Sequence, residues 1–177
     1  MSKKLRAGEK FPDLNLKGLD GRSLKLGVPL RENTEWQMIV VYRGKHCPIC
    51  TKYLKSLNSK QNDFYNAGVD VLAISCDPEQ KVRDHIDEMG IELNIGYDLS
   101  LEQARTLGLY ISEPRSPKET DRPFTEPGIL VVNEESKLHV VDLANNPFVR
   151  PDLDLLLDGL KFIKNPENNY PIRGTME

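Results

Sequence analysis

Cysteine and long apolar runs are both scarce in this sequence. The densest apolar stretch, residues 38–42, is far shorter than the roughly 20 residues of a membrane-spanning helix. Three cysteines among 177 residues are too few, and odd in number, for the disulfide framework of a small secreted protein. The first residues are basic but lack the apolar core of a secretory signal. We therefore expect a cytoplasmic protein with no membrane partner.

A large charge of either sign is also missing. The 24 lysines and arginines nearly balance the 27 aspartates and glutamates, which leaves a formal net charge of −3. Nucleic-acid-binding domains usually carry a strongly basic face, so we expect no nucleic-acid partner. With 38% hydrophobic and 29% charged residues, the composition is typical of a globular domain. We expect a single domain over residues 1–164 and a polar tail over residues 165–177.

The order of the apolar patterns predicts an α/β domain with a mixed sheet. Residues 14–26 alternate between apolar and polar around Asp20 and Gly21, which is typical of a β-hairpin. Unbroken apolar runs are typical of strands covered on both faces. The runs at residues 37–43 and 69–75 are each followed by a helical pattern that ends at a glycine. Further strands are expected at residues 37–43, 69–75, 93–98, 129–132 and 138–143, and helices at residues 50–68, 77–90, 100–108 and 151–163.

Local signals mark two helix starts and one long loop. Ser100 begins a capping box, and Asp77 is expected to cap the helix that follows it, with Pro78 in the first turn. Residues 112–128 are rich in proline and in charge, so they are predicted to form a surface loop. That loop is long for a compact domain, and long loops are often functional.

Cys47 and Cys50 lie between the end of an apolar run and the start of a helical pattern. At a helix N-terminus the free backbone N–H groups and the helix dipole stabilise an anion. Such a position, with cationic neighbours, lowers a thiol pKa from about 8.5 into the range of roughly 3.5–7.5. The sequence supplies such neighbours in Arg43, Lys45, His46 and Lys52. Because only the thiolate is nucleophilic, the pattern predicts a reactive Cys47.

The helical spacing gives the two thiols different roles. Cys50 begins an apolar series that continues through Leu54 and Leu57, so it faces inward, whereas Cys47 lies at the mouth of the helix. We therefore expect Cys47 to attack and Cys50 to resolve, with Pro48 between them in the first helical turn. Two alternatives stay open: a pair of inert core cysteines, and half of a zinc site, for which the sequence offers no second CxxC.

Four segments carry a family resemblance, namely LRAGEKFPDLNLKGLDGRSLKL, IVVYRGKHCPIC, VDVLAISCDPE and EPGILVVNEESKLHVV. Over roughly residues 5–151, the chain resembles the peroxiredoxin-like proteins of the alkyl hydroperoxide reductase/thiol-specific antioxidant family, within the thioredoxin-fold superfamily. The resemblance implies a central mixed sheet flanked by helices, with an N-terminal hairpin. It also implies that Cys47 and Pro48 are the pair that carries the peroxidatic thiol, while the CxxC spacing resembles that of thioredoxins and glutaredoxins.

The same resemblance implies one further site residue and contains two departures. Pro127 stands where thioredoxin-like proteins carry a cis-proline facing the dithiol, so a cis bond is expected between Glu126 and Pro127, with a trans proline entering an edge strand as the alternative. Gly44 occupies the position of the Thr or Ser with which peroxiredoxins hold the peroxide. Pro127 itself lies close to the position of their catalytic arginine, and Arg122 comes several residues too early. Arg43 is expected to stabilise the thiolate.

Two residues have weaker assignments. His46 is expected to add positive charge at the surface, with acid–base catalysis as the alternative. Cys76 follows a strand beside the central one, and ligand sites in such sheets lie at the carboxyl ends of strands. We expect Cys76 to be a buried, inert cysteine, with a third redox thiol as the alternative.

The departures favour thiol–disulfide exchange over peroxide reduction by the same two cysteines. The resemblance implies a disulfide or hydroperoxide substrate, an external dithiol reductant of the thioredoxin or glutathione type, and a monomer or homodimer. No cofactor or metal is expected. A hypothesis outside enzymology is a thioredoxin-fold binding module whose CxxC is incidental and whose 112–128 loop recruits a partner.

Overall fold

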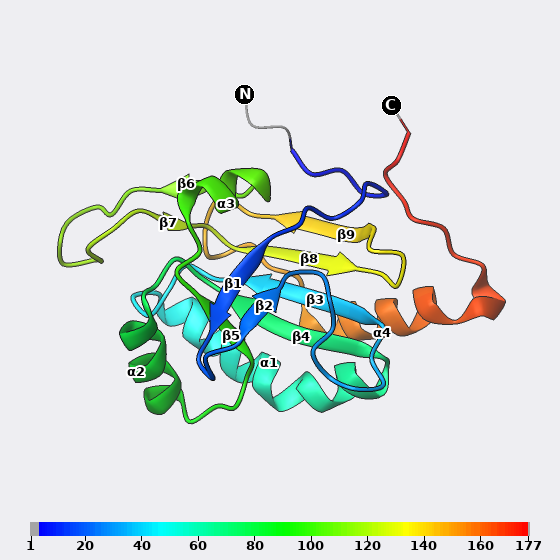
Figure 1. The fold of residues 1–177 in the computed structure, drawn as a ribbon, viewed down its shortest axis with the longest axis horizontal. Coiled ribbons are helices and arrows are strands. Elements are labelled where there is room, and N and C mark those ends of the chain that lie inside the picture. Colours follow the sequence, from blue (N-terminus) through cyan, green and yellow to red (C-terminus); the bar gives the residue numbers. More distant parts are fainter. Residues whose placement is uncertain (1–3, 177) are drawn as a thin grey trace.

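The computed structural model describes residues 4–176 and contains a seven-stranded mixed sheet in the order β2-β1-β5-β4-β3-β8-β9 (Figure 1). Strands β3, β4 and β5 run parallel, and β1, β2, β8 and β9 each pair antiparallel with their neighbours. The strands are β1 (Asn15–Gly18), β2 (Ser23–Lys25), β3 (Trp36–Val41), β4 (Val69–Ile74), β5 (Ile95–Tyr97), β8 (Gly128–Val132) and β9 (Leu138–Leu143). The predicted hairpin and mixed sheet are confirmed.

Helices cover both faces of this sheet. In Figure 1, α1, α2 and α4 lie on one side, and α3 lies on the other. Their bounds are α1 (Pro48–Asn66), α2 (Glu79–Met89), α3 (Leu101–Thr106) and α4 (Leu153–Lys164), followed by a 3-10 helix (Pro166–Asn168). No helix among residues 4–176 is long and apolar enough to cross a membrane.

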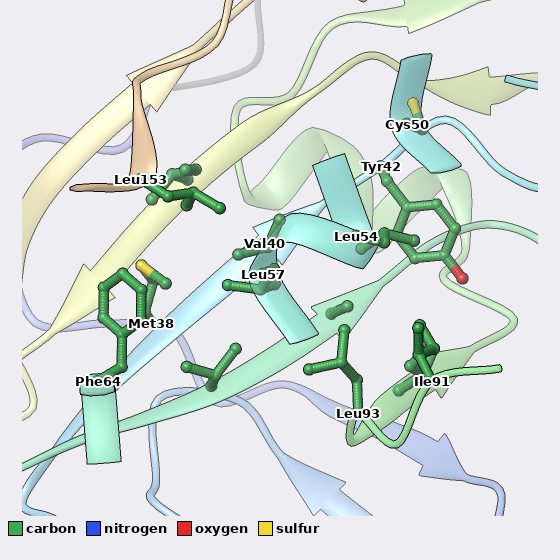
Figure 2. Packing of buried hydrophobic residues seen from close by; sticks show 14 of the residues in the cluster. Met38, Val40, Tyr42, Cys50, Leu54, Leu57, Phe64, Ile91, Leu93 and Leu153 are labelled. Atoms are coloured by element: carbon green, nitrogen blue, oxygen red, sulfur yellow. The ribbon is translucent and has the colours of Figure 1, made fainter. Parts of the chain in front are cut away.

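The core consists of two clusters of buried side chains, one on each face of the sheet. Met38 and Val40 of β3 belong to the cluster under α1 and α4, whereas Ile39 and Val41 belong to the cluster on the other face. Every residue of β3 is buried, as its unbroken apolar run predicts. Figure 2 shows α1 packed along this strand, with Leu57 beside Val40. Cys50, in the first turn of α1, lies near Tyr42. Burial of such side chains stabilises the fold by about 1.5–3 kcal/mol each.

Two predicted local features differ from the structure. The peptide bond between Glu126 and Pro127 is trans, and residues 4–176 contain no cis bond; the prediction of a cis bond is wrong. Asp77 does not cap α2, because Pro78 is the N-cap residue and its side chain makes no capping hydrogen bond. The predicted capping box at Ser100 is confirmed.

The predicted loop is partly ordered into a second, two-stranded sheet. Strands β6 (Ile111–Ser112) and β7 (Phe124–Thr125) pair antiparallel and enclose the charged segment between them. Residues 124–128 are buried, so only the middle of the predicted surface loop is exposed. The loop therefore returns to the sheet just before β8, next to the end of β3.

Candidate active site

The chain from β3 to α1 places Cys47 at the start of the helix. Cys47 is the N-cap residue of α1, with Pro48 as the first helical residue. Its Sγ atom accepts a hydrogen bond from the backbone N–H of Cys50 at 3.2 Å, the role that a polar side chain plays at an N-cap. The first turn of α1 contains no acidic residue. The predicted position of Cys47 at a helix start is confirmed.

Both sulfurs are buried, which differs from the predicted contrast between an outer and an inner thiol. Cys47 is 1% exposed and Cys50 is 0% exposed. Both belong to the cluster that also holds Tyr42 and Leu54. All three cysteines are free. The inward orientation of Cys50 is as predicted, but Cys47 is covered as well.

The two thiols are driven to opposite protonation states. A hydrogen bond from the Cys50 thiol lowers the pKa of Cys47 to about 6, and the Cys50 backbone N–H, Arg43 and Arg150 act in the same direction. Burial raises the pKa of Cys50 well above its usual range, and the neighbouring Cys47 raises it further. Near pH 7, the pair therefore carries one negative charge, held on Cys47 with Cys50 as donor.

Carboxylates from the 112–128 segment balance the charge of Arg43. Its Nε atom lies 3.0 Å from Oε2 of Glu126, and its Nη2 atom lies 3.7 Å from Oε1 of Glu119. The guanidinium also lies 4.7 Å from the centre of the Phe124 ring. Arg43 still contributes a hydrogen bond that lowers the pKa of Cys47. The surroundings of the thiol are thus less cationic than the local sequence indicates.

His46 carries no charge at neutral pH. Burial, and then the nearby Arg43, lower the pKa of His46 to about 4. Its ring meets the Phe124 ring edge-on at 4.5 Å, and neither ring nitrogen has a hydrogen-bond partner among residues 4–176. The prediction that His46 adds positive charge is therefore wrong, because the ring is enclosed against an aromatic neighbour.

The turn before Cys47 requires the glycine at position 44. Gly44 has a φ of +139°, and a Cβ atom there would lie 2.8 Å from both carboxylate oxygens of Asp77. That carboxylate accepts the backbone N–H of Lys45 at 2.7 Å and is 3% exposed. The Thr or Ser of peroxiredoxins has no room here. Asp77 fixes this turn instead of capping α2.

Arg150 is a site residue that the sequence did not indicate. Its Nη2 atom lies 2.6 Å from the Sγ atom of Cys50, 100 residues away in the sequence. The guanidinium also lies 5.0 Å from the centre of the Tyr53 ring, and the Tyr53 hydroxyl donates to the carbonyl of Pro151 at 2.8 Å. Arg150 belongs to the segment between β9 and α4, where no local motif marks it.

Of the remaining predicted residues, Pro127 borders the site and Cys76 lies on the other face of the sheet. Pro127 borders a small cavity of about 10 Å³ together with Tyr53 and Arg150, so it lies on the Cys50 side of the site. Cys76 packs in the cluster on the opposite face of the sheet, and burial raises the pKa of its thiol while Thr125 acts against this. Arg122 pairs with Asp121 at 3.1 Å.

Residues 4–176 contain no group of three or more His, Cys, Asp or Glu side chains arranged to hold a metal ion. Within that part of the chain, the CxxC pair is not joined by the further ligands that a tetrahedral zinc site requires. A groove of about 1260 Å³ lies elsewhere, between residues 4–9, β9 and residues 170–176. None of the predicted site residues lines it.

The mixed sheet and the paired thiols at the start of α1 define a thioredoxin-fold protein of the peroxiredoxin type. The sequence model of the AhpC/TSA family matches residues 7–141, most of the chain, so this protein belongs to the AhpC/TSA family. We assign it as a peroxiredoxin-like oxidoreductase. A comparison with curated proteins gives no match.

Solved structures share this fold at low sequence identity. A mutant of peroxiredoxin 6 of Arenicola marina has a TM-score of 0.75 at 20% identity, over 92% of this chain and 75% of that one. A peroxiredoxin-like protein from Aquifex aeolicus has a TM-score of 0.73 at 18% identity, covering 90% and 88%. The peroxidoxin BcpB from Mycobacterium tuberculosis gives 0.73 at 18% identity, covering 91% and 99%. These likenesses bear on the fold alone.

Proposed function

We propose that this protein reduces small hydroperoxides with a two-cysteine cycle, in which Cys47 is the nucleophile and Cys50 the resolving thiol. The observation that carries the proposal is the position of Cys47: the residue is 1% exposed, and its sulfur caps α1 by accepting the Cys50 N–H at 3.2 Å. A thiolate held in this way near neutral pH is ready for attack. Membership of the AhpC/TSA family supports the same chemistry.

The burial of Cys47 favours a small substrate over a protein disulfide. Attack on a disulfide requires the thiolate to approach a sulfur atom in line. A folded partner does not reach Cys47, a residue that is 1% exposed, without movement of the surrounding chain. A hydroperoxide is small enough to need only a narrow path. The trans bond before Pro127 removes one feature on which the expectation of disulfide exchange rested.

The cycle consists of an attack by Cys47 on a peroxide oxygen and then an attack by Cys50 on the Cys47 sulfur. The Cys47 thiolate attacks the outer peroxide oxygen, the O–O bond breaks, and the alcohol leaves after taking up a proton, so that Cys47 becomes a sulfenic acid. The Cys50 thiolate then attacks the Cys47 sulfur, the S–O bond breaks, and hydroxide leaves and is protonated to water. An external reductant of the thioredoxin or glutathione type supplies two electrons to reduce the disulfide, and a protein reductant requires movement of the chain that covers the two sulfurs. No bound cofactor enters these steps.

Thiol–disulfide exchange is the second candidate function, and the spacing of Cys47 and Cys50 within the first turn of α1 favours it. In that cycle, Cys47 attacks a substrate disulfide, and Cys50 releases the reduced substrate from the mixed disulfide. Both functions use the same two sulfurs with the same roles. They differ in the size of the substrate that must reach Cys47.

Two assays separate these functions. Hydrogen peroxide consumption with dithiothreitol as reductant should be lost in Cys47→Ser and retained in the matched control Cys76→Ser. Reduction of insulin disulfides should stay near the uncatalysed rate for all variants. Insulin reduction that depends on Cys47, without peroxide consumption, would replace the proposal with disulfide exchange. If neither assay depends on Cys47, and its thiol titrates like a free cysteine, the chain is a binding module.

A further inference from the structure

We propose that Arg150 is a positioning residue for the resolving step, holding the Cys50 sulfur and stabilising its thiolate while it attacks Cys47. This inference rests on the proposed two-cysteine cycle. It is carried by the contact between Arg150 Nη2 and Cys50 Sγ at 2.6 Å. Cationic hydrogen-bond donors stabilise a thiolate far more than a neutral thiol, so this contact has its largest effect when Cys50 loses its proton.

Cys50 needs such a partner because its surroundings oppose ionisation. The side chain is 0% exposed, and burial is the largest cause that raises the pKa of Cys50. The titratable and charged groups that act on its sulfur are Cys47, Tyr42 and Arg150, and the backbone of Arg43 adds a hydrogen bond. Of these, Arg150 brings a cationic N–H to the sulfur itself.

The charge of Arg150 is not cancelled by a carboxylate. Among residues 4–176, no Asp or Glu oxygen lies within 4.0 Å of its guanidinium nitrogens, whereas two carboxylates lie within that distance of Arg43. Arg43, which acts on Cys47, has its Nε atom 3.0 Å from the Glu126 carboxylate. In a buried site, an unpaired cation interacts strongly with a nearby anion. Arg150 can therefore stabilise the negative charge of the Cys50 thiolate, whereas nearby carboxylates largely compensate the positive charge of Arg43.

Helix α1 itself holds Arg150 in place. Tyr53 lies three residues after Cys50 in α1, so the two side chains project from neighbouring positions on the helix surface. The Tyr53 ring lies under the guanidinium at 5.0 Å, and its hydroxyl fastens the carbonyl of Pro151 at 2.8 Å. The helix that carries the resolving thiol thus also fixes the segment that carries its cation.

The step at issue is displacement of a leaving group from the Cys47 sulfur. The Cys50 thiol gives up its proton, its sulfur bonds to the Cys47 sulfur, and the leaving group departs with the electron pair of the broken bond and takes up a proton. The leaving group is hydroxide from a sulfenic acid, or a thiolate from a mixed disulfide. Arg150 stabilises the negative charge before it moves to the leaving group. The first attack, by Cys47, does not require this contact.

Methyl methanethiolsulfonate is small enough for a covered thiol and separates the two attacks, because each releases one group: methanesulfinate when Cys47 attacks the reagent, and methanethiolate when Cys50 attacks the Cys47 sulfur. Quenched-flow mass spectrometry of the protein follows both releases. In a Cys76→Ser background, Arg150→Met should slow the first release only slightly, because Arg150 is the last-ranked of the causes that lower the pKa of Cys47. It should slow the second release by roughly 10- to 100-fold, as expected for the loss of a hydrogen bond to a charged group. Arg150→Lys should recover part of the rate, and Arg173→Met, in the exposed tail, should behave as the parent.

The pH profile of the second release distinguishes electrostatic positioning from a packing defect. In Arg150→Met, the rise of the rate with pH should move to higher pH, whereas a packing defect would lower the rate equally at every pH. An unchanged second release in both Arg150 variants overturns the role of Arg150 and leaves the two-cysteine cycle intact. A parent protein that releases no second equivalent overturns the cycle itself, and with it the role of Arg150.

Discussion

The backbone N–H of Cys50 points at the sulfur of Cys47 across 3.2 Å, and this contact links the start of α1 to the reactivity of the thiol. Because the Cys50 thiol and N–H lower the pKa of Cys47 to about 6, alkylation of Cys47 by iodoacetamide should rise with a midpoint near that pH. Cys50, whose pKa burial raises, should stay unmodified over the same range. Peptide mass spectrometry after timed alkylation measures both, and a midpoint above pH 8 for Cys47 contradicts the assignment.

Replacement of Cys50 should weaken the nucleophile as well as remove the resolving thiol. The hydrogen bond from the Cys50 side chain is the largest cause that lowers the pKa of Cys47. Cys50→Ala removes that donor, so the alkylation midpoint of Cys47 should rise by roughly one to two pH units, the equivalent of one hydrogen bond to a charged group. Cys50→Ser keeps a donor and should shift the midpoint less. Equal midpoints in the parent and Cys50→Ala would show that the backbone alone holds the thiolate.

The turn at Gly44 should tolerate no side chain. In Gly44→Ala, the new Cβ meets the Asp77 carboxylate at 2.8 Å on a backbone with φ of +139°, so the free energy of unfolding should fall by about 1–3 kcal/mol. Gly21→Ala is the matched control, because Gly21 also has a positive φ, +80°, but nothing lies within 4 Å of its added Cβ. Urea unfolding measures both variants. Equal losses would mean that backbone strain, and not the carboxylate, sets the requirement.

The enclosed His46 should make the fold sensitive to mild acid. Its pKa in the folded protein, about 4, lies below its ordinary value of 6.5, so the unfolded chain binds a proton more readily. The stability that neutral His46 contributes is fully present above about pH 6.5 and is lost as the pH falls towards about 4. The stability of the parent relative to His46→Gln should decline over this window, measured by urea unfolding. An NMR titration midpoint for His46 near 6.5 would contradict the prediction.

Local sequence patterns predicted the elements that position Cys47. The unbroken apolar run of β3 indicates a strand buried on both faces, and Cys47-Pro48 before a helical pattern indicates a helix start. Both follow from short-range rules, in which the backbone and its next neighbours decide the structure. The capping box at Ser100 is confirmed for the same reason.

Tertiary contacts decided the features that the sequence did not reveal. Asp77 resembles a helix cap in sequence, but its carboxylate turns to the backbone of Lys45, 32 residues earlier. His46 is uncharged because it is buried, and it packs against Phe124 of β7, a residue distant in the sequence. The contact between Arg150 and Cys50 spans 100 residues. No local spacing encodes such pairs, because their energy depends on which segments the complete fold brings together.

The most direct test of the account is the covalent state of the cysteines after one equivalent of hydrogen peroxide. Peptide mapping of the intact protein should find a disulfide between Cys47 and Cys50, with Cys76 still a thiol. In Cys50→Ser, a dimedone adduct should form on Cys47, because its sulfenic acid then has no resolving partner. Oxidation that begins at Cys76, or a Cys47 that remains a thiol while peroxide is consumed, contradicts the central claim that Cys47 is the nucleophile.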